Sequence, residues 1–182
     1  MSLHREKKVL LFINLFAGGS VITSYIWGLL AHPGKSTALW GNVPSGLLPF
    51  YTISMAAAAV GYLIFTGYLI FFVDPDKCEI SGRYSFRLFN WLYGIILVFS
   101  ALWMPLTFIM LEEPSAFLWL TIRFVLAAVG LGSISFLAAI FTLQPTGPTW
   151  VYRAALFGCV LFAFQTAILD AMVWPAYFPY NF

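Results

Sequence analysis

The sequence has few charged residues for its length. Asp, Glu, Lys and Arg make up only 9% of its 182 residues, whereas hydrophobic residues make up 62%. A soluble domain carries about 25% charged residues, so this chain lacks the polar surface that would face water. Its formal net charge is only +2, without a basic patch or stripe, and we therefore expect no nucleic-acid partner.

Residues that support chemistry inside a membrane are also scarce. The two histidines, His4 and His32, lie outside the long hydrophobic runs, and no lysine lies within one. This excludes haem ligation by histidines of two spans, an intramembrane H-E-x-x-H zinc site and a lysine Schiff base. Cys78 and Cys159 form no Cys-x-x-Cys motif and are expected to stay unpaired. We expect no catalytic residues, no metal site and no enzyme activity, and no motif identifies a cofactor.

Long hydrophobic blocks make up most of the chain. A helix needs about 20 mostly apolar residues to cross a bilayer. Five blocks reach this length, and short segments rich in Pro, Gly and charged residues separate them. We therefore predict an all-α polytopic membrane protein, a five-helix transmembrane bundle in which the whole chain, 1–182, forms one transmembrane domain. The predicted spans are residues 9–31, 47–73, 86–111, 116–141 and 150–174.

Lys and Arg are distributed unevenly between the two ends of this predicted bundle. Short cytoplasmic loops of membrane proteins carry an excess of Lys and Arg. If the five spans alternate in direction, only Lys35 falls at the end opposite the N-terminus. The basic residues at the N-terminal end are Arg5, Lys7, Lys8, Lys77, Arg83, Arg87 and Arg153. We therefore expect an integral, multi-pass membrane protein with its N-terminus in the cytoplasm and its C-terminus outside.

Aromatic residues gather near the predicted ends of the spans. Trp27 and Trp40 flank the outer end of the first span, and Trp174 lies near the outer end of the fifth. Trp and Tyr are enriched at membrane–water interfaces, where their amphipathic rings sit among the head groups. We interpret these residues as interfacial anchors rather than as a ligand cage.

Two charged residues lie well inside the predicted spans, Arg123 in the fourth and Asp170 in the fifth. Such a residue costs about 2.5–3.5 kcal/mol at a helix centre, so it usually faces protein or water and finds a partner. Both fall in the outer half of the bundle. We predict that they pair, or share a polar pocket with Glu112 and Glu113 of the third span. Gln165, which has no obvious local partner, completes the candidate ligand-binding site.

Two asparagines lie near the inner ends of the first and third spans. Asn14 and Asn90 are close enough in predicted depth to meet. Buried amides commonly form hydrogen bonds between transmembrane helices. We predict a hydrogen bond between these two residues.

The candidate pocket leads to one main hypothesis and several alternatives. The main one is a small integral membrane protein that binds or transports a small molecule, lipid or ion in the outer half of helices three to five. Alternatively, the Arg123–Asp170 pair only locks two helices, or Arg123 snorkels to head groups. Stripes of small residues, such as Ala155, Cys159 and Ala163, would also suit an accessory or assembly subunit that docks on a membrane-protein partner or a second copy. A lipid-modifying reaction at Asp170 or at Glu112 and Glu113, with a borrowed metal, is the enzymatic alternative.

Overall fold

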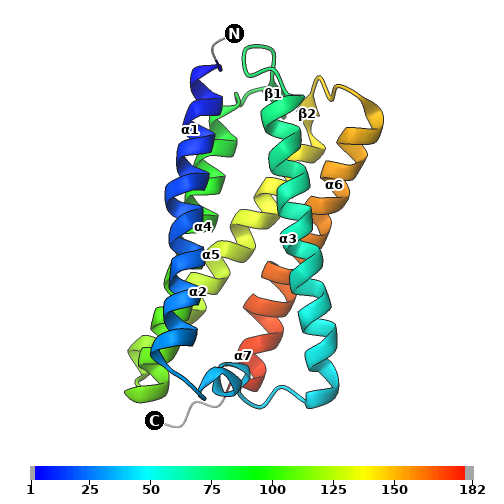
Figure 1. Cartoon of the computed structure of the whole chain (residues 1–182). Helices are drawn as coiled ribbons and strands as arrows, with labels where there is room; N and C mark the ends of the chain where they lie inside the picture. The colour runs from blue at the N-terminus through cyan, green and yellow to red at the C-terminus, as the bar shows by residue number, and fades with distance from the viewer. Residues whose placement is uncertain (1–2, 179–182) are drawn as a thin grey trace.

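The apolar blocks of the sequence become five long antiparallel helical spans (Figure 1). This computed structural model describes residues 3–178. The spans are 26 to 29 residues long and apolar enough to cross a membrane, as in a multi-pass membrane protein. Their bounds are Arg5–Ala31, Ser45–Phe71, Arg87–Glu112, Ala116–Phe141 and Thr149–Tyr177. The predicted all-α bundle is confirmed, and its predicted boundaries differ by only a few residues.

Two of the five spans contain π-helical segments, in which the backbone bonds from i to i+5. Such segments are rare and frequently occur at functional sites. The first span comprises α1 (Arg5–Ile13), the π-helical η1 (Asn14–Gly18) and α2 (Gly19–Ala31), and the fifth comprises α6 (Thr149–Ala163), the π-helical η4 (Phe164–Val173) and α7 (Trp174–Tyr177). The α-helices of the other spans are α3 (Leu48–Phe71), α4 (Arg87–Glu112) and α5 (Ala116–Phe141).

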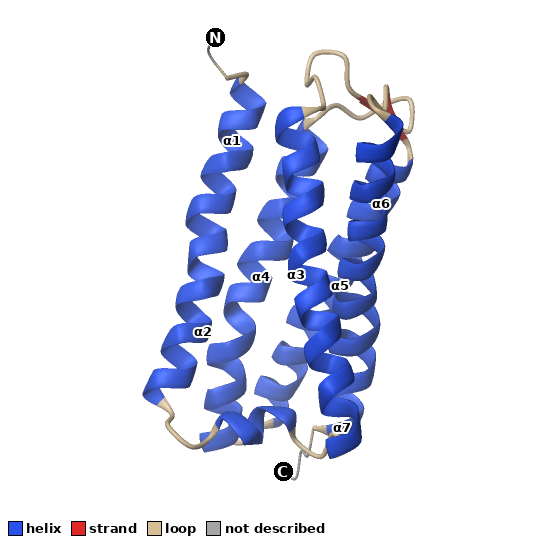
Figure 2. Cartoon of the chain, turned by 45° about the vertical axis from the view of Figure 1, so that its right-hand side comes forward, coloured by secondary structure: helices blue, strands red, loops and turns tan. Residues whose placement is uncertain are grey.

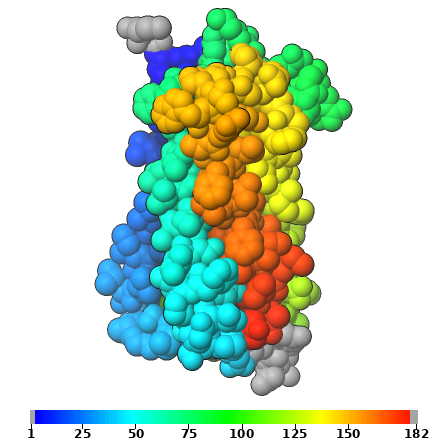
Figure 3. Space-filling model, turned by 90° about the vertical axis from the view of Figure 1, so that its right-hand side faces the viewer, coloured from blue at the N-terminus to red at the C-terminus, as the bar shows by residue number. Residues whose placement is uncertain are grey.

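α3 and α6 approach each other so closely that their backbones touch. A Cβ atom added to Gly61 would lie 2.5 Å from the carbonyl oxygen of Gly158, and one added to Gly158 would lie 2.8 Å from that of Gly61. Figure 3 shows the two helices side by side on one face of the molecule. The small residues Ala155, Cys159 and Ala163 of α6 are buried in the monomer as well. The small-residue stripe of the fifth span thus serves packing within this chain.

The first span lies at the side of the bundle and packs on α4 (Figure 2). Among its described residues only Leu10 and Gly28 are buried. Gly28 fits against α4 because a Cβ there would meet Met104 at 2.6 Å and Phe108 at 2.8 Å. This one-sided packing leaves the flank of the first span that faces α3 largely without helix contacts.

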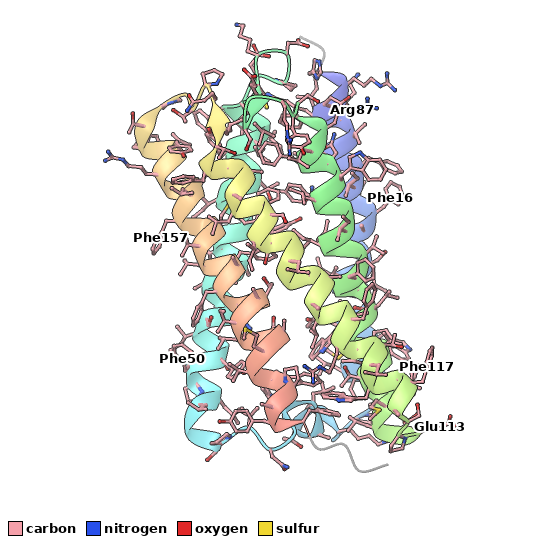
Figure 4. All side chains as sticks on the ribbon, turned by 180° about the vertical axis from the view of Figure 1, so that it is seen from behind. Phe16, Phe50, Arg87, Glu113, Phe117 and Phe157 are labelled. Carbon is pink, nitrogen blue, oxygen red and sulfur yellow. The ribbon has the colours of Figure 1, made fainter. Side chains whose placement is uncertain are left out.

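Apolar side chains cover the outside of the bundle. Phe16, Phe50, Phe117 and Phe157 project outward from four different spans (Figure 4), and each is exposed over 49–78% of its surface. Large exposed apolar surfaces of this kind mark protein or membrane contacts. The distribution fits spans that face lipid.

Each end of the bundle is closed by a short ordered connection. At the N-terminal end, β1 (Glu79–Ile80) pairs antiparallel with β2 (Leu143–Gln144). At the opposite end, the loop of residues 32–47 contains the short 3-10 helices η2 (Ser36–Trp40) and η3 (Ser45–Leu47). We call this segment the capping loop.

Hydrogen bonds attach the capping loop to the fifth span. The indole Nε1 of Trp174 donates to the carbonyl oxygen of Leu39 at 2.8 Å, and the amide of Asn42 donates to the carbonyl oxygen of Tyr177 at 2.8 Å. Leu39 is also buried. The loop therefore lies across the end of the helices.

The predicted hydrogen bond between Asn14 and Asn90 is wrong. Asn14 instead accepts a hydrogen bond from the hydroxyl of Tyr62 on α3. Asn90 donates to the carboxylate of Glu6 at 2.8 Å. Glu6 and Asn14 are separated by about 12 Å along the first span at 1.5 Å per residue, so the two asparagines contact that helix at different heights.

Candidate functional site

A cavity of about 870 Å³ lies between the first span and α3. Small-molecule sites in proteins have volumes of about 300–1,000 Å³. All five spans contribute to its walls, although α5 supplies only Leu126 and Val129. Ser36, Leu39 and Trp40 of the capping loop also line it. The cavity thus occupies the space that the one-sided packing of the first span leaves open.

Aromatic rings line the end of the cavity near the capping loop. The ring centroid of Trp103 lies 5.8 Å from that of Tyr25 and 5.7 Å from that of Trp174. The rings of Trp40 and Tyr51 lie 5.7 Å apart. These five residues come from the first span, the capping loop, α3, α4 and the fifth span, so the cluster exists only in the folded bundle.

Asp170 and Gln165 form the main polar pair of this wall. Gln165 Nε2 donates a hydrogen bond of 2.8 Å to Asp170 Oδ1, and both residues line the cavity. Residues five apart in an α-helix point about 140° away from each other. The i to i+5 bonding of η4 brings them onto one face instead. Gln165 therefore has a local partner, contrary to the expectation from the sequence.

Two buried polar atoms of residues in this wall have no hydrogen-bond partner among residues 3–178. They are Oε1 of Gln165, whose side chain is only 4% exposed, and Nε1 of Trp103. An unsatisfied buried polar atom costs about 1–3 kcal/mol. Both atoms belong to residues that line the cavity.

The structure brings together only two of the five predicted site residues. Asp170 and Gln165 meet in the cavity wall, between the first span and α3 rather than among helices three to five. Glu112 lies outside the cavity and accepts a hydrogen bond from Nζ of Lys35 at 3.1 Å. Glu113 is exposed at the end of the bundle (Figure 4). The acidic residues of the third span are therefore not part of this pocket.

The predicted pair of Arg123 and Asp170 is wrong. Arg123 lies on an exposed face of α5, whereas Ile122 and Val125 beside it are buried. Among the described residues, no carboxylate lies within ion-pair distance of Arg123. The rise per residue indicates how deep Arg123 and Asp170 lie in the bundle. The direction of each side chain depends on the rotation of its helix, which is set by packing. The exposed position is compatible with snorkelling to head groups.

The sequence did not identify the aromatic part of the site. The sequence favours a role as interfacial anchors for Trp40 and Trp174, but both line the cavity and Trp174 is only 3% exposed. Tyr25 and Tyr51 also line it without a motif that marks them. The only sequence signal was the position of these residues near the ends of spans, which interfacial anchors share.

Comparison of the chain with protein-family models, with curated proteins and with solved structures found no match. Its function is therefore argued from the geometry of the cavity. Among residues 3–178, no three His, Cys, Asp or Glu side chains are grouped so that they could hold a metal ion. The residues in the wall are suited to noncovalent binding through apolar contacts and a few hydrogen bonds.

Proposed function

We propose that this protein binds a small lipid-soluble molecule inside its helical bundle. The observation that carries the proposal is the 870 Å³ cavity, whose walls are mainly apolar and aromatic and contain the Asp170–Gln165 pair. Ligand sites typically combine apolar walls with a few polar groups that orient the ligand. The cavity has this composition.

The position of the cavity mouth indicates entry from the membrane. Leu15, Ile22 and Leu63 line the cavity, and each residue is 64–71% exposed. All three lie within the apolar spans, between the first span and α3. A hydrophobic molecule dissolved in the bilayer could therefore pass sideways into the cavity without crossing water.

The charge distribution gives the proposed site an orientation. With the N-terminus in the cytoplasm, as the excess of Lys and Arg at that end favours, Asp170 lies in the outer half of the membrane. The capping loop then covers the outer end of the cavity. Binding from the bilayer is the role that this arrangement supports best, and transport would require the loop to open.

The packing of small residues favours ligand binding over the role of an accessory subunit. Gly61 and Gly158, the closest contact between helices, face each other within one chain. Ala155 and Cys159 are buried in the same interface region. The surfaces that would dock on a partner are thus largely used inside the monomer.

A cavity-filling variant tests the proposal. Gly19 lines the cavity, and a Cβ added there would meet nothing within 4 Å. Gly19→Phe should therefore place a ring in open space at the cavity wall and narrow the cavity without displacing a helix. Gly67→Phe on α3 is a matched control, because a Cβ there meets only the Phe71 side chain at 4.0 Å and Gly67 lies outside the cavity.

The measurement is native mass spectrometry of protein extracted in mild detergent, before and after addition of a lipid extract. We expect a bound small molecule on the unsubstituted protein and on Gly67→Phe, and its loss from Gly19→Phe. Equal adducts on all three proteins would identify lipid held on the outer surface. That result, or the lack of any adduct, would overturn the proposal.

A further inference from the structure

We infer that the ligand of this cavity is a cationic amphiphile, an apolar molecule with a protonated amine that binds Asp170. The inference rests on the proposed ligand-binding function and goes further by naming the chemical class of the ligand. It is carried by the surroundings of the Asp170 carboxylate, by the free acceptor of Gln165 and by the aromatic rings of the same wall.

Asp170 has no cationic partner in the part of the chain that the structure describes. None of the ion pairs among residues 3–178 includes it, and its hydrogen-bond donor is the neutral amide of Gln165. A carboxylate within a membrane-spanning helix is costly unless it is paired. Among residues 3–178, no Lys, Arg or His lines the cavity. A cationic ligand would supply the countercharge that the protein does not.

The hydrogen-bonding groups beside Asp170 also favour an amine. Asp170 lines the cavity, and the Gln165 side chain hydrogen-bonded to it carries an unpartnered acceptor, Oε1. An ammonium group has three donors and can satisfy both side chains, whereas a hydroxyl group has one. Hydrogen bonds between an ammonium and a carboxylate are also roughly twice as strong as neutral ones. The unpartnered Nε1 of Trp103 would accommodate an additional acceptor, such as a hydroxyl or carbonyl oxygen.

The aromatic rings provide a second attraction for a cation. Tyr25, Tyr51 and Asp170 line the same cavity. Trp103 and Trp174 continue this cluster through ring contacts of 5.8 and 5.7 Å. The faces of Trp and Tyr rings attract cations, and the attraction is larger where water is excluded. Such a wall would bind an ammonium group more favourably than an uncharged head group.

The rest of the cavity suits a hydrocarbon body. Beyond the aromatic cluster its walls include Val21, Ala58, Leu97 and Phe162. An anionic amphiphile, such as a fatty acid or a phosphate ester, would place its charge against Asp170 with no Lys, Arg or His in the wall to compensate. The cavity should therefore discriminate between ligands by the charge of the head group. It should not require a particular hydrocarbon chain.

A head-group series on one chain length tests the inference. The full-length protein is placed in phosphatidylcholine nanodiscs at pH 7 and titrated separately with dodecylamine, dodecanol and dodecanoic acid. Binding is measured by native mass spectrometry. We expect dodecylamine to bind about tenfold or more tightly than the other two, the change expected for a charge-assisted hydrogen bond.

Two variants test whether the preference for dodecylamine depends on Asp170. Asp170→Asn keeps the shape of the side chain and should bring the affinity for dodecylamine down to that for dodecanol. Glu112→Gln removes a carboxylate at the same end of the bundle, outside the cavity, and should leave the preference for the amine unchanged. If Asp170→Asn fails to fold, the head-group series on the unsubstituted protein still decides the question.

The outcomes separate the two proposals. If dodecanol or dodecanoic acid binds as tightly as dodecylamine, and Gly19→Phe abolishes binding of all three, the cavity binds ligands but the cationic class is wrong. If no member of the series binds in a way that depends on Gly19, both the cationic class and the proposed function are overturned. An amine preference that persists in Asp170→Asn would also overturn the inference, because it would arise elsewhere.

Discussion

Gln165 donates a hydrogen bond of 2.8 Å to Asp170, five residues further along the same span. The contact depends on the π-helical segment η4, because an α-helix would place the two side chains on different faces. The same pair carries the polar character of the cavity wall. A local change in helical register thus brings two polar side chains together in the cavity wall.

Replacing Asp170 should stabilise the protein while it impairs binding. Asp170→Asn removes a charge that has no countercharge among the described residues, and a carbonyl oxygen remains to accept from Gln165. We expect the ligand-free variant to gain on the order of 1 kcal/mol in unfolding free energy, because a carboxylate without a countercharge is costly within a membrane-spanning helix. Thermal unfolding followed by circular dichroism in one detergent measures this. A lower melting temperature would show that Asp170 is mainly structural.

The contact between Gly61 and Gly158 should tolerate no side chain. In Gly61→Ala the new methyl group would lie 2.5 Å from a backbone oxygen, which cannot move without shifting α6. Overpacking of this kind costs about 1–3 kcal/mol. Thermal denaturation should show a clearly lower melting temperature for Gly61→Ala and Gly158→Ala. The melting temperature of Gly67→Ala should change little. Equal stability of all three variants would mean that α3 and α6 do not cross at these glycines.

The thiol of Cys78 should react slowly in the folded protein. Cys78 lies in the connection between the second and third spans, and burial, with a contribution from the charge of Asp74, raises its pKa to about 11. Because the thiolate is the nucleophile, a raised pKa lowers reactivity at pH 8. In a Cys159→Ala background, we expect maleimide labelling to be about a hundredfold slower in the native protein than in dodecyl sulfate. The rate should rise as the pH approaches 11, and rapid labelling at pH 8 would contradict this.

The orientation in the membrane can be tested with single cysteines at the two ends of the bundle. Lys35→Cys and Lys77→Cys are placed in a Cys78→Ser, Cys159→Ala background, and both positions are exposed. With a cytoplasmic N-terminus, a membrane-impermeant maleimide should label Lys35→Cys in intact cells. It should label Lys77→Cys only after permeabilisation. The opposite pattern would reverse the orientation inferred from the Lys and Arg distribution.

The sequence by itself determined the five spans, their approximate bounds and the choice of Asp170 and Gln165 as candidate site residues. These properties are local, because the length of an apolar block and the cost of a charge within it are read along the chain without knowledge of its neighbours. The same reasoning placed Arg123 at a suitable depth. It could not show that the side chain of Arg123 faces outward.

Only the tertiary structure decided which side chains meet. The rotation of each helix about its axis follows from contacts between distant segments, such as Gly61 with Gly158 and Gly28 with Met104. The π-helical register of η4 then turns Gln165 toward Asp170. The cavity exists because the first span packs mainly on α4 and leaves its other side open. This asymmetry depends on the packing of all five spans and is not encoded in any single helix.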